Sequence, residues 1–401
     1  MRRKSRLSVV LYFEKGGTTM PGSYYLPAVN LIDFGAVAKV GSWIRTLGGS
    51  RVLIAAAAAH PGEEHAALAA EHLSREGIAS VPFVKVLPNP TDVLVEEGAA
   101  LYRAERCDAL VAIGGGSAMD CTKAIGAVVT NGGSIRDYEG TNRLRIALPP
   151  FVAINTTAGT GSEITRFAVI TDTERHVKMT LADWRLTPDV SINDPELMLS
   201  MPPGLTAATG MDALSHAVES LVSLNASPLT EALSLKAARL VFDFLPRAVR
   251  DGNDREAREM MTHAAFLAGA AFNNSGLGLV HAMSHPLGAK YNLPHGVLNA
   301  LLLPHVERYN AVTCFEKFSL LGEHLGIVRS WHSSGENAET TLQAMGRLAE
   351  DVGIPASLAR LGVKSEDLGE LARQADQEEI GRTNPRKASV ETIRELYRAA
   401  M

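Results

Sequence analysis

The feature that most constrains the fold of this chain is a change of pattern near residue 200. Before it, short apolar runs alternate with stretches that are typical of helices, and after it these runs stop. Regular alternation of strands and helices favours a mainly parallel sheet with helices on both faces. We predict strands over residues 51–59, 81–87, 108–117, 151–157, 167–172, 176–181 and 189–194.

The second half of the 401-residue chain has the periodicity of helices instead. Apolar side chains recur at positions i, i+3, i+4 and i+7 over residues 227–245, 254–272, 296–312 and 338–353. Pro202, Pro203 and Gly204 mark the boundary between the two patterns. The sequence therefore predicts a loosely ordered extension over residues 1–19, an α/β domain over 20–200 and an all-helical domain over 201–401.

Composition excludes several classes of protein. The formal net charge is −5 and no basic stripe is present, so we expect no nucleic-acid partner. No run of eighteen apolar residues occurs, which argues against a membrane span. The amino terminus is basic and its short apolar run has no small-residue cleavage site, so Met20 is a candidate true start. The three cysteines are widely spaced, which favours a reducing, cytoplasmic location.

Two glycine- and hydroxyl-rich turns follow predicted strands in the first half. AIGGGSAMD places Gly114 to Ser117 between a strand and a helix, where free amides and the helix dipole favour a phosphate group. NTTAGTGSE, residues 155–163, is the second turn. Each alone is equally consistent with an ordinary turn, and neither has the Walker or G-x-G-x-x-G spacing. Together they favour a ligand crevice at the carboxyl ends of the strands.

The second half contains an unusual group of histidines. His281, His285 and His295 lie in the nearly uncharged segment GLGLVHAMSHPLGAKYNLPHG, residues 276–296. A lone histidine on an apolar helix is more often a hydrogen-bonded core residue than a ligand. Pro286 makes regular helix at residue 285 less favourable, and the loop that follows can return His295 to the same point.

A carboxylate in a neighbouring segment offers these histidines a partner. Asp212 and His216 are four residues apart in a helical context, so they share one face. Burying the Asp212 carboxylate without a partner costs several kcal/mol, and an ion held by carboxylate and imidazole removes that cost. Three histidines and one carboxylate suit Fe²⁺ or Zn²⁺, although nickel and cobalt also accept such a site.

These segments resemble a known family. GGGSAMD, NTTAGTGSE, INDPELM, TAATGMDALSHAVE and HAMSHPLGAKYNLPHG are similar to motifs of the iron-containing (group III) alcohol dehydrogenases, and the similarity runs from about residue 24 to the carboxyl terminus. Within the family the chain looks similar to dimeric enzymes that act on small alcohols, such as lactaldehyde reductase and 1,3-propanediol dehydrogenase. The resemblance implies a dehydroquinate synthase-like architecture: an α/β domain with a dinucleotide-binding crevice, then an all-α domain that holds the metal and the substrate.

The resemblance also implies roles for individual residues. The metal ligands would be Asp212, His216, His281 and His295, and His285 would line the substrate pocket as a catalytic residue without ligating. The implied contacts to NAD or NADP come from Asn89, Gly115, Gly116, Ser117, Thr157, Thr160, Val169 and Lys178. The family usually has Asp after its first predicted strand, where it meets the adenosine ribose, whereas this chain has Ala57.

The expected activity is hydride transfer between NAD(P) and a small primary alcohol or aldehyde, in a homodimer or higher homo-oligomer. The alternative is a lyase of the dehydroquinate synthase type, which uses NAD and a metal without net oxidation. Such an enzyme needs several basic side chains around the metal for its phosphorylated substrate, and the ligand segments offer only Lys290. A catalytically inactive relative would be expected to lose ligands, and none is lost here.

Overall fold

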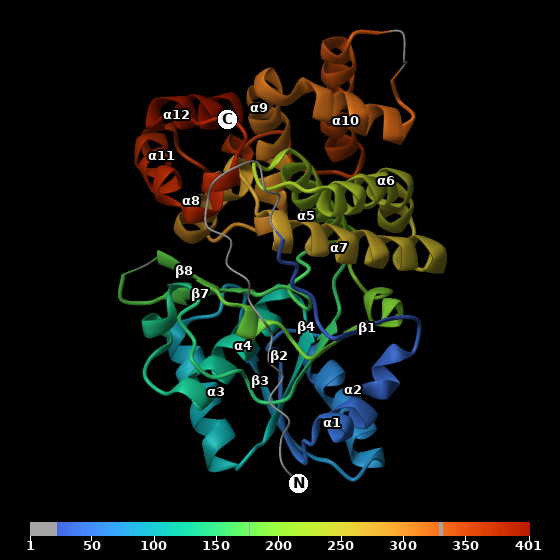
Figure 1. Cartoon of the computed structure of the whole chain (residues 1–401), viewed down its shortest axis with the longest axis vertical. Helices are drawn as coiled ribbons and strands as arrows, with labels where there is room; N and C mark the ends of the chain where they lie inside the picture. Colours follow the sequence, from blue (N-terminus) through green and yellow to red (C-terminus); the bar gives the residue numbers. More distant parts are fainter. Residues whose placement is uncertain (1–21, 176, 329–331) are drawn as a thin grey trace.

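The computed structural model describes residues 22–175, 177–328 and 332–401, so the expected extension over residues 1–19 lies outside the described residues. The strands lie in the first half and long helices make up the second (Figure 1). Among the described helices, none combines the length and apolarity needed to cross a membrane.

A six-stranded sheet organises the first half, with strand order β1-β9-β6-β4-β2-β3 and parallel pairing throughout. The parallel sheet that strand–helix alternation predicted is therefore confirmed. The strands are β1 (Val29–Ile32), β2 (Arg51–Ala57), β3 (Ala79–Val86), β4 (Ala109–Gly114), β6 (Phe151–Asn155) and β9 (Val190–Asn193). The prediction from sequence missed β1, a strand of only four residues.

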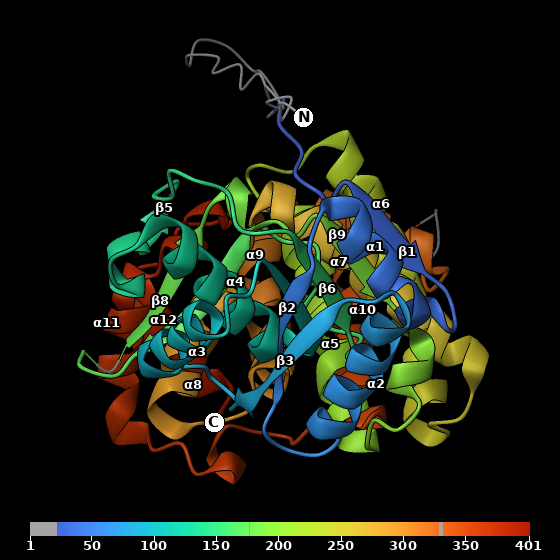
Figure 2. The same cartoon turned by 90° about the horizontal axis from the view of Figure 1, so that it is seen from below.

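Helices cover both faces of this sheet, and alternate residues of β2 show why. Val52 and Ile54 pack with α1 and α2 in one apolar cluster, whereas Leu53 and Ala55 pack with α3 and α4 in another. Successive side chains of a strand point to opposite faces, so a fully apolar strand is buried on both. In Figure 2, α2 lies on one side of β2 and β3, and α3 and α4 lie on the other. The helices are α1 (Val40–Leu47), α2 (Gly62–Arg75), α3 (Asp92–Ala104) and α4 (Gly116–Asn131), and the 3-10 helices are η1 (Ala36–Lys39), η2 (Ile135–Tyr138), η3 (Trp184–Leu186) and η4 (Pro195–Met198).

Two of the predicted strands do not join the large sheet, which corrects the expectation. β7 (Phe167–Asp172) and β8 (Val177–Ala182) pair antiparallel, and with β5 (Gly140–Thr141) they form a separate three-stranded sheet. Only residues 173–176 separate β7 from β8. A parallel crossover needs a dozen or more residues, so such a short connection forces a hairpin. Asp172 supports the turn by accepting from the backbone N–H groups of Glu174 and Arg175.

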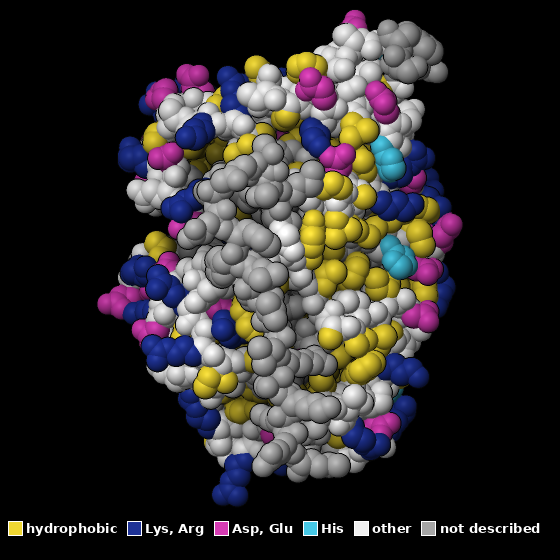
Figure 3. Space-filling view, viewed as in Figure 1, with side chains coloured by type: hydrophobic (Ala, Val, Ile, Leu, Met, Phe, Trp, Pro, Cys, Tyr) yellow, Lys and Arg dark blue, Asp and Glu magenta, His cyan; other side chains and the backbone are white. Residues whose placement is uncertain are grey.

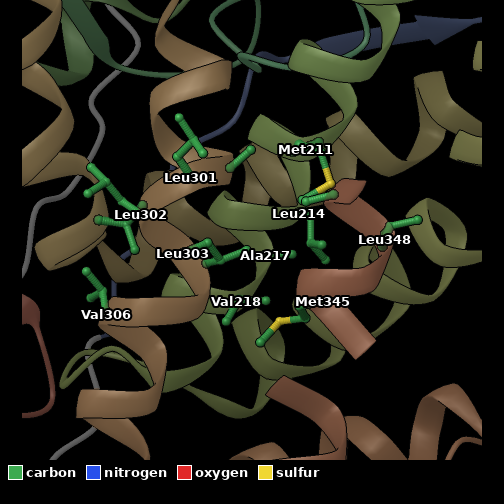
Figure 4. Packing of buried hydrophobic residues seen from close by; sticks show 14 of the residues in the cluster. Met211, Leu214, Ala217, Val218, Leu301, Leu302, Leu303, Val306, Met345 and Leu348 are labelled. Atoms are coloured by element: carbon green, nitrogen blue, oxygen red, sulfur yellow. The ribbon is translucent and has the colours of Figure 1, made fainter. Parts of the chain in front are cut away.

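The second half is all-helical, as its periodicity predicts. Its apolar faces meet in one cluster that includes Met211 and Leu214 of α5, Leu302 of α9 and Met345 of α10 (Figure 4). The helices are α5 (Pro203–Val222), α6 (Pro228–Arg250), α7 (Arg255–Ser275), α8 (Leu279–Tyr291), α9 (His295–Leu325), α10 (Ser334–Asp351), α11 (Leu368–Gln377) and α12 (Val390–Ala399), with 3-10 helices η5 (Ala359–Leu361), η6 (Ser365–Asp367) and η7 (Glu379–Thr383).

Pro286 lies inside α8, so the expectation that helix becomes less regular at His285 is wrong. The residue before a proline disfavours helical backbone through local sterics alone. Here α8 is buried over most of its length, and its tertiary packing outweighs that preference. The chain reverses after the left-handed residue Asn292, and α9 begins at His295. This short connection returns His295 toward α8, as expected from the sequence.

Candidate metal centre and cofactor crevice

The candidate ligand residues meet at one carboxylate oxygen. The Nε2 atoms of His216, His281 and His295 each lie 3.9 Å from Oδ1 of Asp212. These residues come from three helices, because Asp212 and His216 lie on α5, His281 on α8 and His295 on α9. For Asp212, His216 and His281, one ligand atom of each lies within 4.8 Å of the others.

These separations fit a shared cation. A distance of 3.9 Å is too long for a hydrogen bond. Two ligand atoms that each lie about 2.1 Å from one ion are separated by at most about 4.2 Å. Asp212, His216 and His281 are also almost completely buried, whereas the side chain of His295 is 33% exposed. Asp212, His216 and His281 therefore suit one shared ion, and Nε2 of His295 lies at the same 3.9 Å from the Asp212 oxygen.

Asn299, which the sequence analysis did not identify, strengthens this assignment. Its Nδ2 lies 2.7 Å from Oδ1 of Asp212, 3.0 Å from Nε2 of His281 and 3.1 Å from Nε2 of His295. Three acceptor atoms thus converge on a positively polarised group that has only two hydrogens. Among the described residues, none donates a hydrogen bond to the buried Oδ1 of Asn299. The same group of acceptor atoms would also attract a metal cation.

The electrostatics of the site favour ligands that are ready to bind. Burial lowers the pKa of His216 to about 4 and that of His281 to about 3, in each case against the charge of Asp212, which acts to raise it. Burial and the neighbouring His281 also lower the pKa of His295. Metal ligation requires neutral imidazole, so at neutral pH these three rings are in the form that coordinates an ion.

His285 is close to the cluster but is held by a different partner. Its ring centroid lies 5.6 Å from that of His295. Its Nδ1 lies 3.2 Å from Oε2 of Glu378, which precedes η7. Sequence reasoning missed Glu378 because it lies 93 residues away along the chain. Only the fold brings these two side chains together.

The two glycine-rich turns face one another at the carboxyl ends of β4 and β6. Gly115 precedes α4, and a Cβ atom there would lie 3.1 Å from the Thr157 side chain. At Gly116 it would lie 3.0 Å from the Thr160 side chain. The first amides of α4, including that of Ser117, have no helical partners and suit a phosphate group. Strand β4 lies between β2 and β6, next to the point where the strand order reverses and α/β proteins bind ligands.

The remaining candidate cofactor residues border the same region. Val169 donates its backbone N–H to Asp120 of α4. Burial lowers the pKa of Lys178 on β8, against the attraction of the Asp120 carboxylate. Asn89 donates from Nδ2 to Oδ1 of Asn292, at the end of α8. The structure therefore brings candidate cofactor residues and candidate metal ligands to adjoining parts of the molecule.

A parallel sheet with such turns, next to a carboxylate–imidazole cluster, is typical of enzymes that use a dinucleotide and a metal ion. Two family models match the chain: iron-containing alcohol dehydrogenase over residues 27–195, and its C-terminal counterpart over residues 206–401. The chain therefore belongs to the iron-containing alcohol dehydrogenase family, and it is an oxidoreductase. This confirms the resemblance and favours a dehydrogenase over the lyase alternative.

Individual relatives are similar over nearly their whole length. The 1,3-propanediol dehydrogenase of Citrobacter freundii is 45% identical over 379 residues, which cover 94% of this chain and 98% of that protein. The NAD-dependent methanol dehydrogenase of Bacillus methanolicus is 44% identical, covering 94% of this chain and all of that protein. The crystal structure of a 1,3-propanediol oxidoreductase has a TM-score of 0.93 at 44% identity, covering 94% of this chain and 99% of that one.

Proposed function

We propose that this protein is a metal-dependent dehydrogenase that transfers a hydride between NAD(P) and a small primary alcohol or aldehyde. The observation that carries the proposal is the convergence of three histidine Nε2 atoms on one Asp212 oxygen, each at 3.9 Å. The names of the relatives, which refer to methanol and 1,3-propanediol, support a short primary alcohol as the substrate.

In this proposal the two halves of the chain bind different groups. Residues 20–200 form the dinucleotide-binding domain, and residues 201–401 form the metal-binding and substrate domain. Fe²⁺ is the favoured ion because of the family, with Zn²⁺ as the alternative. The ligands are Asp212, His216, His281 and His295, and the cofactor contacts come from Asn89, Gly115, Gly116, Ser117, Thr157, Thr160, Val169 and Lys178.

The side chains of this protein position the reactants and hold the proton. When bound, the divalent ion supplies a Lewis acid for the substrate oxygen, and the nicotinamide supplies the hydride acceptor. The buried ligand helices exclude water from one side of the site. His285 has its Nδ1 close to Glu378, so its Nε2 is left to receive the hydroxyl proton during alcohol oxidation.

A panel of short alcohols and aldehydes, measured with both cofactors on metal-reconstituted protein, tests the proposed activity. We expect net formation of NADH or NADPH from alcohols and net consumption with aldehydes. A lyase of the dehydroquinate synthase type would give no net change in the cofactor. Reconstituted protein that is inactive in both directions with every substrate would contradict the proposal.

We also propose that the protein is cytoplasmic and forms a homodimer or higher homo-oligomer. Among the described residues, β1 pairs only with β9, so its outer edge is available to another chain. Exposed strand edges are common sites of association. Figure 3 shows hydrophobic side chains gathered on one part of the displayed face, with basic and acidic side chains interspersed around it. Light scattering on the purified protein measures the oligomeric state directly.

Ala57 leads to a prediction about cofactor choice. It is the last residue of β2, at the carboxyl edge of the sheet. An aspartate there would accept from the ribose 2′-hydroxyl and would repel a 2′-phosphate. The nearby His60 is paired with Glu64, which opposes any attraction of a phosphate. We therefore expect the wild-type protein to use both NAD and NADP.

The substitution Ala57→Asp should raise the ratio of kcat/KM for NAD to that for NADP by at least about tenfold, or roughly 1.4 kcal/mol. Steady-state kinetics with both cofactors measure this ratio. Ala67→Asp adds the same charge at an exposed position of α2 and serves as the control. An unchanged ratio in Ala57→Asp would mean that residue 57 does not lie at the ribose.

A further inference from the structure

Glu219 is a buried carboxylate that the proposed reaction does not use. It lies on α5, three residues after His216, and is 1% exposed. Both of its oxygens have partners on α8. Oε1 accepts from the backbone N–H of Val280 at 2.8 Å, and Oε2 contacts Nδ1 of His281. One side chain therefore holds both the first turn of α8 and the ring of a candidate ligand.

The contact with Oε2 determines which nitrogen of His281 carries the proton. In its ionised form this carboxylate only accepts hydrogen bonds, and the facing Nδ1 is then the protonated nitrogen. Nε2 is then left with its lone pair. The other side of the ring agrees, because Nδ2 of Asn299, which can only donate, lies 3.0 Å from Nε2. Nε2 is also the atom that lies 3.9 Å from Asp212 Oδ1.

We propose that Glu219 is a positioning residue of the metal centre, which fixes the tautomer and orientation of His281 so that Nε2 faces the ion. This proposal rests on the proposed function, because it takes His281 as a ligand. Partners of this kind raise ligand basicity and hold the ring in place before the ion binds.

The packing around Glu219 leaves this arrangement little freedom. A Cβ atom at Gly278 would lie 2.9 Å from Oε1 of Glu219 and 2.7 Å from Oδ1 of Asn384, so only glycine allows this approach. His295 is held differently. Its Nδ1 lies 3.3 Å from the hydroxyl of Ser284, which donates to the backbone carbonyl of His281, so its partner is a neutral hydroxyl rather than a carboxylate.

The test compares two matched substitutions of buried glutamates. In Glu219→Gln, the amide can donate to His281 Nδ1 and thereby favour the tautomer that cannot ligate through Nε2. Glu307→Gln is the control, because Glu307 is equally buried, acts electrostatically on the same region and contacts Asn310 rather than a ligand. Both variants remove one potential negative charge from the core of the helical domain.

The readout is affinity for Zn²⁺ and Co²⁺, measured on metal-free full-length protein by competition with a chelator. We expect Glu219→Gln to weaken binding by about 10–100-fold and to change the visible spectrum of bound Co²⁺, while Glu307→Gln matches wild type. Equal affinity in Glu219→Gln and wild type, or equal weakening in both variants, would overturn the proposal for Glu219 alone. A wild-type protein that binds neither ion would contradict the proposed function as well.

A second measurement needs no variant and so does not depend on the folding of Glu219→Gln. Nitrogen NMR of histidine-labelled wild-type protein loaded with Zn²⁺ reports the protonated ring nitrogen of each ligand. We expect His281 to be protonated at Nδ1 and coordinated through Nε2. Protonation at Nε2 would overturn the proposal.

Discussion

Asp212→Ala and His281→Ala should each purify as folded protein that contains little metal, and alcohol turnover should fall by at least about a thousandfold. Asp212→Ala removes the Oδ1 atom on which the histidines converge, and His281→Ala removes one of the Nε2 atoms that lie 3.9 Å from it. The Lewis acid is worth several kcal/mol of transition-state stabilisation, and about 4 kcal/mol corresponds to a thousandfold change in rate. Elemental analysis, circular dichroism and steady-state kinetics measure the three quantities.

His263→Ala is the matched control for these ligand variants. His263 is only partly buried on α7 and lies outside the ligand cluster, so its replacement should retain both metal and activity. Chelation of wild-type protein should reproduce the ligand variants, and returning the ion should restore turnover. If either ligand variant keeps its full metal content and activity, the ligand assignment is wrong.

His285→Ala should keep the metal and lower kcat by about 10²–10⁴-fold. This is the range by which a positioned acid–base group accelerates a reaction. The ring of His285 lies beside that of His295, and its Nδ1 contacts Glu378 rather than Asp212. The pH dependence of kcat should change as well, because a proton relay is removed.

Glu378→Gln provides a graded comparison for His285→Ala. It leaves the imidazole in place but removes the carboxylate that lies 3.2 Å from Nδ1, so kcat should fall by less than in His285→Ala. The metal content of both variants decides between the two possible roles of His285. A loss of metal equal to that in His281→Ala would make His285 a ligand.

Local pattern predicted most of the fold because most of its elements are determined locally. The apolar run that became β2 is buried at Val52 through Ala56, as expected for a central strand of a parallel sheet. The periodicity of residues 254–272 likewise corresponds to α7. The misassigned hairpin of β7 and β8 had a local signal, because the predicted strands over residues 167–172 and 176–181 are too close in sequence for a parallel crossover.

The candidate site was predicted as far as residue type and spacing allow. Asp212 and His216 are one helical turn apart, so their proximity follows from the sequence alone. Glu219 and Glu378 were missed because their histidine partners lie on another helix, and only the fold brings them together. Asn299 has a local signal that could have identified it, since it lies four residues after His295 on α9.

Formation of reduced nicotinamide cofactor by metal-stripped and iron-reloaded wild-type protein, with 1,3-propanediol and other short primary alcohols, tests the central claim most directly. The account predicts no formation with the stripped protein, formation after Fe²⁺ is returned, and none when the alcohol is omitted. Equal rates in the stripped and reloaded protein would contradict the role of the metal. Reloaded protein that reduces neither NAD nor NADP with any of these alcohols would contradict the proposed reaction itself.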